Sequence, residues 1–151
     1  MSANLPRFHN KTVWITGASS GVGEGLARVF RREGADLIIS ARREAELERV
    51  KASCPEGPGS VHVLPFDLTS EPQRRLAADQ VLERYERLDV LINNAGIGQR
   101  SLIKDTLPEV DRRVMEVDFF APVALTRLVL PRMMAQRSGH VVVTSSVAGK
   151  H

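Results

Sequence analysis

Thr12–Gly25 reads T-V-W-I-T-G-A-S-S-G-V-G-E-G and decides the fold. Its first residues are apolar or β-branched and predict a buried strand, and a helical pattern begins near Val22. Between them lie Gly17, Gly21 and Gly23, in the spacing T-G-x-x-x-G-x-G. A helix that starts after such a turn aims free N–H groups and its positive dipole end at one place, and glycines let a pyrophosphate approach. We interpret the segment as a dinucleotide-binding loop; the alternative is a plain strand-to-helix turn.

Short apolar runs alternate with longer helical patterns along the rest of the chain. We expect strands at Thr12–Thr16, Asp36–Ser40, Val61–Pro65, Val90–Asn93 and His140–Ser145, and helices at Val22–Glu33, Arg43–Ser53, Glu71–Arg87 and Leu107–Gln136. This alternation favours right-handed βαβ units around a parallel sheet. The predicted fold class is α/β, a doubly wound Rossmann-type parallel sheet truncated after about five strands. Residues 1–151 are expected to form one NAD(P)-binding domain that is incomplete at its C-terminal end.

The charge pattern argues against a nucleic-acid partner. The net charge of +3 comes from scattered arginines beside glutamates, with no basic stripe interleaved with aromatic residues. Cys54 is the only cysteine and the four histidines show no metal-ligand spacing, so neither an internal disulfide nor a metal site is expected. Arg127 interrupts the best apolar candidate for a membrane span, Phe119–Met134, and no signal-peptide pattern precedes the first strand. We expect a cytoplasmic protein that binds neither nucleic acid nor membranes.

Residues just after each strand are the candidate ligand contacts, because ligands of such sheets bind at the carboxyl ends of the strands. Arg42 follows the second strand, and no acidic residue occurs there before Glu44. An acidic residue at this place holds a ribose 2′-hydroxyl, whereas an arginine accommodates a 2′-phosphate. A charge-assisted contact of about 1.5–3 kcal/mol predicts a preference for NADP(H) over NAD(H) of at least about tenfold. The alternative is a solvated charge at the start of a helix.

The turns after the third, fourth and fifth strands supply further polar side chains. Asp67-Leu68 follows the third, where Asp67 either accepts from an adenine amino group or caps the helix near Glu71. Asn93–Gly96 follows the fourth and allows a ribose or nicotinamide to approach, while Asn93 is expected to tie neighbouring strands together. Thr144–Gly149 follows the fifth and places a hydroxyl beside the nicotinamide. Ordinary turn chemistry is the alternative for the last two.

Together these motifs resemble the short-chain dehydrogenase/reductase family. They are T-G-A-S-S-G-V-G at Thr16–Gly23, D-L at Asp67-Leu68, N-N-A-G at Asn93–Gly96 and S-S-V-A-G at Ser145–Gly149, in the family's order and spacing. The residues around them, at Ser40–Lys51 and Gln99–Ser101, are similar to the branch that contains dehydrogenase/reductase member 7 and bacterial relatives. The resemblance implies reversible hydride transfer between C4 of a nicotinamide and a carbonyl or secondary alcohol.

The resemblance also assigns roles to individual residues. Ser146 matches the serine that hydrogen-bonds the substrate oxygen. Asp67, with Leu68 beside it, matches the adenine contact. The positions that match the pyrophosphate loop are Gly17, Ser19, Ser20, Gly21, Val22 and Gly23. Those that match the nicotinamide ribose side are Asn94, Ala95 and Gly96.

Two departures from the family pattern concern catalysis. An asparagine that helps to hold a proton-relay water is replaced by Asp118, which keeps an acceptor but loses the amide donor. The family's Tyr-x-x-x-Lys pair falls beyond His151, and the only tyrosine, Tyr85, lies on a charged helix in the wrong place. We expect a cofactor-binding part that needs the missing half before it can turn over a carbonyl or alcohol. The alternative is a non-catalytic nucleotide-binding or interaction module.

The end of the predicted sheet is expected to be exposed. Relatives continue with a further helix and more strands, so His140–Ser145 would become an edge with unpaired backbone groups and no charge or proline to discourage pairing. We therefore expect self-association through this strand and Leu107–Gln136. Pro122 and Pro131 each remove a backbone donor and are expected to bend that helix or divide it.

Overall fold

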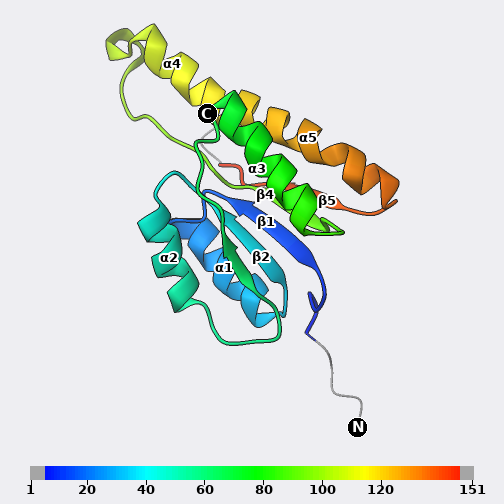
Figure 1. Ribbon diagram of the computed structural model, residues 1–151. Coiled ribbons are helices and arrows are strands. Elements are labelled where there is room, and N and C mark those ends of the chain that lie inside the picture. The colour runs from blue at the N-terminus through cyan, green and yellow to red at the C-terminus, as the bar shows by residue number, and fades with distance from the viewer. Residues whose placement is uncertain (1–5, 147–151) are drawn as a thin grey trace.

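The computed structural model describes residues 6–146, whose strands form a parallel sheet in the order β3-β2-β1-β4-β5 (Figure 1). The chain runs outward from β1 to β3 and then crosses back to place β4 on the other side of β1. The order therefore reverses between β1 and β4, which makes this the switch point where ligands of such sheets bind. The predicted α/β, doubly wound fold is confirmed. The strands are β1 (Thr12–Thr16), β2 (Asp36–Ser40), β3 (Val61–Val63), β4 (Val90–Asn93) and β5 (His140–Val143).

Helices cover both faces of this sheet (Figure 1). On one face lie α1 (Gly21–Arg32) and α2 (Glu44–Ser53), and on the other lie α3 (Glu71–Arg84) and α5 (Ala121–Ala135). Because successive side chains of a strand point to opposite faces, β1 contributes Val13 and Ile15 to the α1–α2 core and Trp14 to the α3–α5 core. Trp14 is fully buried, and its ring N–H donates to Ser40 Oγ at 2.9 Å, so the buried donor is satisfied.

Most predicted boundaries agree with the structure, and the differences have local causes. β3 and β5 each end two residues earlier than predicted, at Val63 and Val143. α3 ends at Arg84 rather than Arg87. The guanidinium of Arg132, from α5, donates to backbone carbonyl groups at this end, and so takes the place of a further helical turn. These acceptors are the carbonyl oxygens of Leu82, Tyr85 and Glu86, at 2.9, 3.0 and 2.8 Å.

The single long helix predicted over Leu107–Gln136 is divided. After the short 3-10 turn η1 (Ile103–Asp105), α4 covers Pro108–Met115, the π-helical segment η2 covers Glu116–Phe120, and α5 follows. Pro122 lies in the first turn of α5. Because it has no backbone N–H and its ring would clash with the carbonyl of the preceding turn, the regular pattern of α-helical hydrogen bonds is interrupted there. The predicted division is confirmed at Pro122, whereas Pro131 lies inside α5 without ending it.

β5 is an edge strand, as predicted, and pairs with β4 alone in the described sheet. Its valines, Val141, Val142 and Val143, are 41%, 43% and 62% exposed, although β-branched residues of this kind are buried in β1. Self-association through this strand stays a prediction. Within residues 6–146 no helix is both long enough and apolar enough to cross a membrane.

Candidate cofactor-binding site

A cleft of about 410 Å³ opens at the carboxyl ends of the strands, at the switch point between β1 and β4. Ten of the cofactor-binding residues predicted from the sequence lie in its wall. They are Gly17, Ser19, Ser20, Val22, Arg42, Asp67, Leu68, Asn94, Ala95 and Gly96. The structure therefore brings together segments that are up to eighty positions apart in the chain. Their contacts with a cofactor stay predictions.

The glycines of the first loop have different structural roles. Gly17 has a φ of +64°, and a Cβ there would lie 2.6 Å from the Cα of Ala95, so Gly17 lets two loops pack together. A Cβ on Gly23 would collide with the Gly17 carbonyl oxygen, so it too serves the packing of the loop. Gly21 has a φ of +57°, and a Cβ there would meet nothing within 4 Å among the described residues. The open space lies at Gly21, where the prediction puts a phosphate.

Asn94 and Thr16 join the first and fourth strands at this point. The Asn94 side-chain amide donates to the carbonyl oxygens of Thr16 and Gly17, at 3.3 and 3.1 Å. Thr16 Oγ1 accepts from the backbone N–H groups of Asn94 and Ala95, at 3.1 and 3.2 Å, and donates to the Ile92 carbonyl. The two loops that line the cleft are therefore held to each other without a ligand.

The prediction that Asn93 ties neighbouring strands was wrong. Its side chain is buried, and its amide donates to Thr126 Oγ1 at 3.0 Å, which joins the sheet to α5 instead. Side chains of a strand alternate between faces, so Asn93 and Asn94 cannot serve the same neighbour. Asn94 makes the connection between strands.

Asp67 belongs to a turn and does not cap α3. Its Oδ1 accepts from the backbone N–H and the hydroxyl of Thr69, at 2.9 and 2.8 Å, whereas α3 has Ser70 at its N-cap position. The capping alternative is therefore wrong, and the adenine contact stays a prediction. Burial would raise the pKa of Asp67, but the bonds from Thr69 and the charges of Arg113 and Arg42 hold it below its usual value. The carboxylate remains ionised at neutral pH.

One end of the cleft is basic. Arg42 and Arg43 lie just before α2, and Arg113 reaches the same cleft from α4. Sequence reasoning missed Arg43 and Arg113, because neither belongs to a motif and Arg113 looks like one of many exposed helical charges. Only the packing of α4 over the strand ends could reveal it. The other lining residues, to which the sequence analysis assigned no individual role, are Thr16, Ser40, Ala41, Phe66, Thr69, Ile97, Val117 and Thr144.

The two catalytic candidates lie outside the wall of this cleft. Asp118, on η2, accepts from the Ile97 backbone N–H through Oδ1 at 2.8 Å, so the residue that replaces asparagine holds the loop after β4. Ser146 is exposed, and Thr144 is the residue after β5 that lines the cleft. Val147, Ala148 and Gly149, the rest of that motif, lie outside the described residues, as do Lys150 and His151. The roles of Asp118 and Ser146 stay predictions.

Other reactive side chains lie away from this cleft. Tyr85 follows α3 and packs against the α3–α5 core, and its burial raises the pKa of its hydroxyl. Cys54 follows α2, and burial likewise raises the pKa of its thiol. In residues 6–146 no group of three or more His, Cys, Asp or Glu side chains is arranged to hold a metal ion.

Comparisons with known proteins agree with this geometry. Residues 11–151 match the family model described as short chain dehydrogenase. Among curated relatives, dehydrogenase/reductase SDR family member 7 of Homo sapiens is 43% identical over 141 residues, and member 7B of Bos taurus is 45% identical over 147 residues. These matches cover 91% and 93% of this chain but only 42% and 45% of the relatives. The chain thus spans less than half the length of either relative.

Solved structures give the same result. A metagenomic short-chain oxidoreductase in complex with NADP is 31% identical, with a TM-score of 0.89 over 95% of this chain and 66% of that one. A 7α-hydroxysteroid dehydrogenase complexed with NADH and 7-oxo glycochenodeoxycholic acid is 27% identical, with a TM-score of 0.90 over 100% of this chain and 59% of that one. The two hold different dinucleotides, so they do not decide which one this chain prefers. The chain belongs to the short chain dehydrogenase family, on the branch of family member 7.

Proposed function

We propose that these residues form the NADP(H)-binding part of an oxidoreductase that transfers hydride between a nicotinamide and a carbonyl or secondary alcohol. The observation that carries the proposal is the cleft at the switch point, where the glycine loop and three arginines converge. The nicotinamide ring supplies the hydride chemistry when it is bound. The residues of this chain bind and orient the cofactor.

The start of α1 suits a pyrophosphate. Within the described chain, the side chain of the N-cap residue Ser20 makes no capping hydrogen bond, so the first N–H groups of α1 are left for another acceptor. The positive end of the helix dipole lies at the same place, and the space beside Gly21 is open. A phosphate group would satisfy these donors without moving a side chain.

The basic end of the cleft suits a 2′-phosphate. Arg42, Arg43 and Arg113 lie around the turn after β2, and an acidic residue that would bind a 2′-hydroxyl is absent there before Glu44. An arginine can bind a phosphate through two parallel hydrogen bonds, which a ribose hydroxyl cannot match. The preference for NADP(H) over NAD(H) therefore follows from the arginines.

We also propose that Ser146 contacts the oxygen of a carbonyl or alcohol substrate, as its match to the family serine implies. Thr144 reaches the cleft from the same end of β5, so that segment leads towards the nicotinamide side. We do not assign the proton-donor role to Tyr85, because Tyr85 packs against the α3–α5 core and does not line the cleft. The cytoplasmic setting and self-association stay predictions.

Fluorescence titration with NADPH and NADH tests the proposal. The parent chain should bind NADPH at least about tenfold more tightly than NADH, and Arg42→Ala should remove most of that preference. Arg113→Ala should also weaken NADPH binding, whereas Arg112→Ala, an exposed neighbour outside the cleft wall, serves as the matched control. Equal affinities in the parent would refute the 2′-phosphate assignment. Failure to bind either dinucleotide would refute the proposed function.

A further inference from the structure

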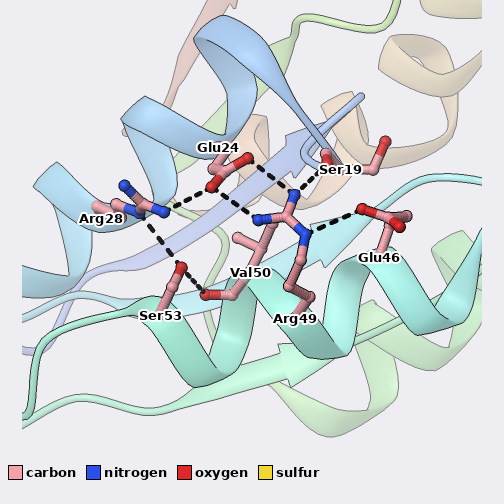
Figure 2. A network of polar contacts seen from close by, with 7 residues as sticks. All are labelled: Ser19, Glu24, Arg28, Glu46, Arg49, Val50 and Ser53. Carbon is pink, nitrogen blue, oxygen red and sulfur yellow. Dashed lines mark hydrogen bonds and ion pairs between the residues drawn. The ribbon is translucent and has the colours of Figure 1, made fainter.

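A network of polar contacts joins α1, α2 and the glycine loop, and Arg49 lies at its centre (Figure 2). The Arg49 guanidinium donates to the Ser19 carbonyl oxygen at 3.1 Å, in the loop itself. It also donates to both carboxylate oxygens of Glu24, on α1, at 3.1 and 3.0 Å, and to Glu46 Oε2 at 2.9 Å. One side chain of α2 thus contacts α1 and the cofactor loop together.

Arg28 takes part in the same network without reaching the loop. It donates to Glu24 Oε1 at 2.6 Å and to Ser53 Oγ at 3.2 Å, and Ser53 in turn donates to the Val50 carbonyl. Both side chains therefore link α1 to α2, Arg49 through Glu24 and Arg28 through Ser53 (Figure 2). Of these two arginines, Arg49 is the one whose side chain donates a hydrogen bond to Ser19 in the described part of the chain.

We propose that Arg49 is a positioning residue for the dinucleotide, because it sets the direction of the Ser19–Ser20 peptide group. A trans peptide unit is planar, and its C=O and N–H point in opposite directions. Arg49 holds the Ser19 carbonyl on the α2 side, so the Ser20 N–H faces the other side, where both serines line the cleft. The inference rests on the proposed function, since it assigns a phosphate to this donor.

The chemistry of the contact requires arginine. A planar guanidinium carries donors in a rigid fork and can serve Glu24, Glu46 and the Ser19 carbonyl at once, whereas the ammonium of a lysine is a point charge on a flexible stem. The hydrogen bond from Arg49 is the main cause that lowers the pKa of Glu24, so this carboxylate remains ionised at neutral pH and the contact persists.

The same helix also relates the two ends of the cleft. α2 begins directly after Arg42 and Arg43, and Arg49 lies one and a half turns further along it. The Arg49 contact therefore fixes the pyrophosphate loop relative to the segment that carries the 2′-phosphate arginines. Loss of Arg49 should weaken NADPH and NADH alike, whereas loss of Arg42 should weaken NADPH selectively.

The test compares Arg49→Ala, Arg49→Lys and the matched control Arg28→Ala by titration with NADPH and NADH. Arg49→Ala should weaken both dinucleotides by about five- to tenfold, the factor that one ordinary hydrogen bond corresponds to. Arg28→Ala should stay within about twofold of the parent, since it removes exposed contacts to Glu24 and Ser53 and none to the glycine loop. Arg49→Lys should lose affinity nearly as much as Arg49→Ala, because it keeps the charge but not the fork.

Hydrogen exchange of the ligand-free protein provides a second readout. The backbone N–H groups of residues 20–23 should exchange faster in Arg49→Ala than in Arg28→Ala, with similar thermal midpoints for the two variants. Equal losses of affinity in the two variants, or parent-like affinity in Arg49→Lys, would overturn the positioning role. If the parent binds the dinucleotides and Arg49→Ala binds them equally well, this inference fails while the proposed function stands. If the parent binds neither, both fail.

Discussion

The β1–β2 core and the β5 edge contain the same kinds of residue and have opposite environments. We use β1–β2 core for β1 and β2 with α1 and α2, and β5 edge for β5 alone. Every residue of β1 is buried, while every residue of β5 is exposed. β1 has a strand on each side and helices on both faces, whereas β5 has one neighbouring strand within residues 6–146. Burial is thus decided by the position of a strand in the sheet and not by its valines.

The candidate site follows this division. Both cofactor loops leave the buried part of the sheet, after β1 and β4, and are held together by Asn94 and Thr16. From the β5 side only Thr144 lines the cleft, among the described residues. A binding site needs a rigid support, so the cofactor end of the cleft is built on the better-packed half.

The largest effect should come from removing a side chain of the β1–β2 core. Ile39→Ala should destabilise the protein by about 2–5 kcal/mol, since Ile39 is fully buried against α1 and α2 and its loss leaves a cavity. Val142→Ala in β5 should cost well under about 1 kcal/mol, because the side chain is already half in water. Urea unfolding of the two variants checks this, and similar losses would mean that β5 is covered in solution.

A smaller loss is expected at Gly17. Gly17→Ala forces a Cβ against the Ala95 backbone in a left-handed conformation, which should cost about 2–3 kcal/mol and separate the two cofactor loops. Gly25→Ala is the matched control: it lies in α1, and its Cβ would meet nothing within 4 Å in the described structure. The control should gain about 0.5–1 kcal/mol. Thermal unfolding with dinucleotide titration measures both, and an unaffected Gly17→Ala would contradict the packing role.

Self-association through the β5 edge should depend on the charge of its exposed side chains and not on their size. Val142→Lys places a charge on an exposed edge strand, and charged edge residues discourage pairing with another chain. We expect less concentration-dependent association in sedimentation velocity, with little change in the unfolding midpoint. Leu76→Lys, on an exposed position of α3, controls for the added net charge. If the control reduces association equally, the edge is not the surface that associates.

The smallest expected effect is a difference between the outer strands β3 and β5 in how stability depends on pH. Burial is the main cause that lowers the pKa of His62 in β3 from its ordinary 6.5, and the charges of Arg84 and Lys51 add to it. The unfolded chain then binds the proton more readily, so the contribution of His62 to stability is present above about pH 6.5 and is lost as the pH falls through the folded value.

Urea midpoints at about pH 7.5 and about pH 5.5 measure this effect. His62→Gln should reduce the loss of stability between the two conditions, while His140→Gln, at the exposed start of β5, should leave it unchanged. An equal reduction in both variants would mean that the edges do not differ in this respect.

Much of the architecture could be predicted because it is written in local patterns. β1, β2 and β4 have the predicted bounds, since apolar runs between turn residues specify strands directly. Pro122 and Pro131 were predicted to bend the long helix or divide it, and only the structure shows that the division falls at Pro122, because a proline allows either a bend or a break. The sequence also left two roles open for Asp67. An aspartate before a helix can accept hydrogen bonds either from a residue two positions later, as it does here from Thr69, or from the first N–H groups of the helix.

By itself, the sequence determined the strand, glycine turn and helix around Gly17, the parallel sheet and the loop residues that face the cleft, since these depend on neighbours along the chain. The tertiary structure alone decided the position of Arg113 at the basic end of the cleft, the Asp118–Ile97 hydrogen bond and the hydrogen bond from Arg49 to Ser19. Each of these joins residues from different elements. Such contacts depend on how helices pack over a sheet, which local patterns do not specify.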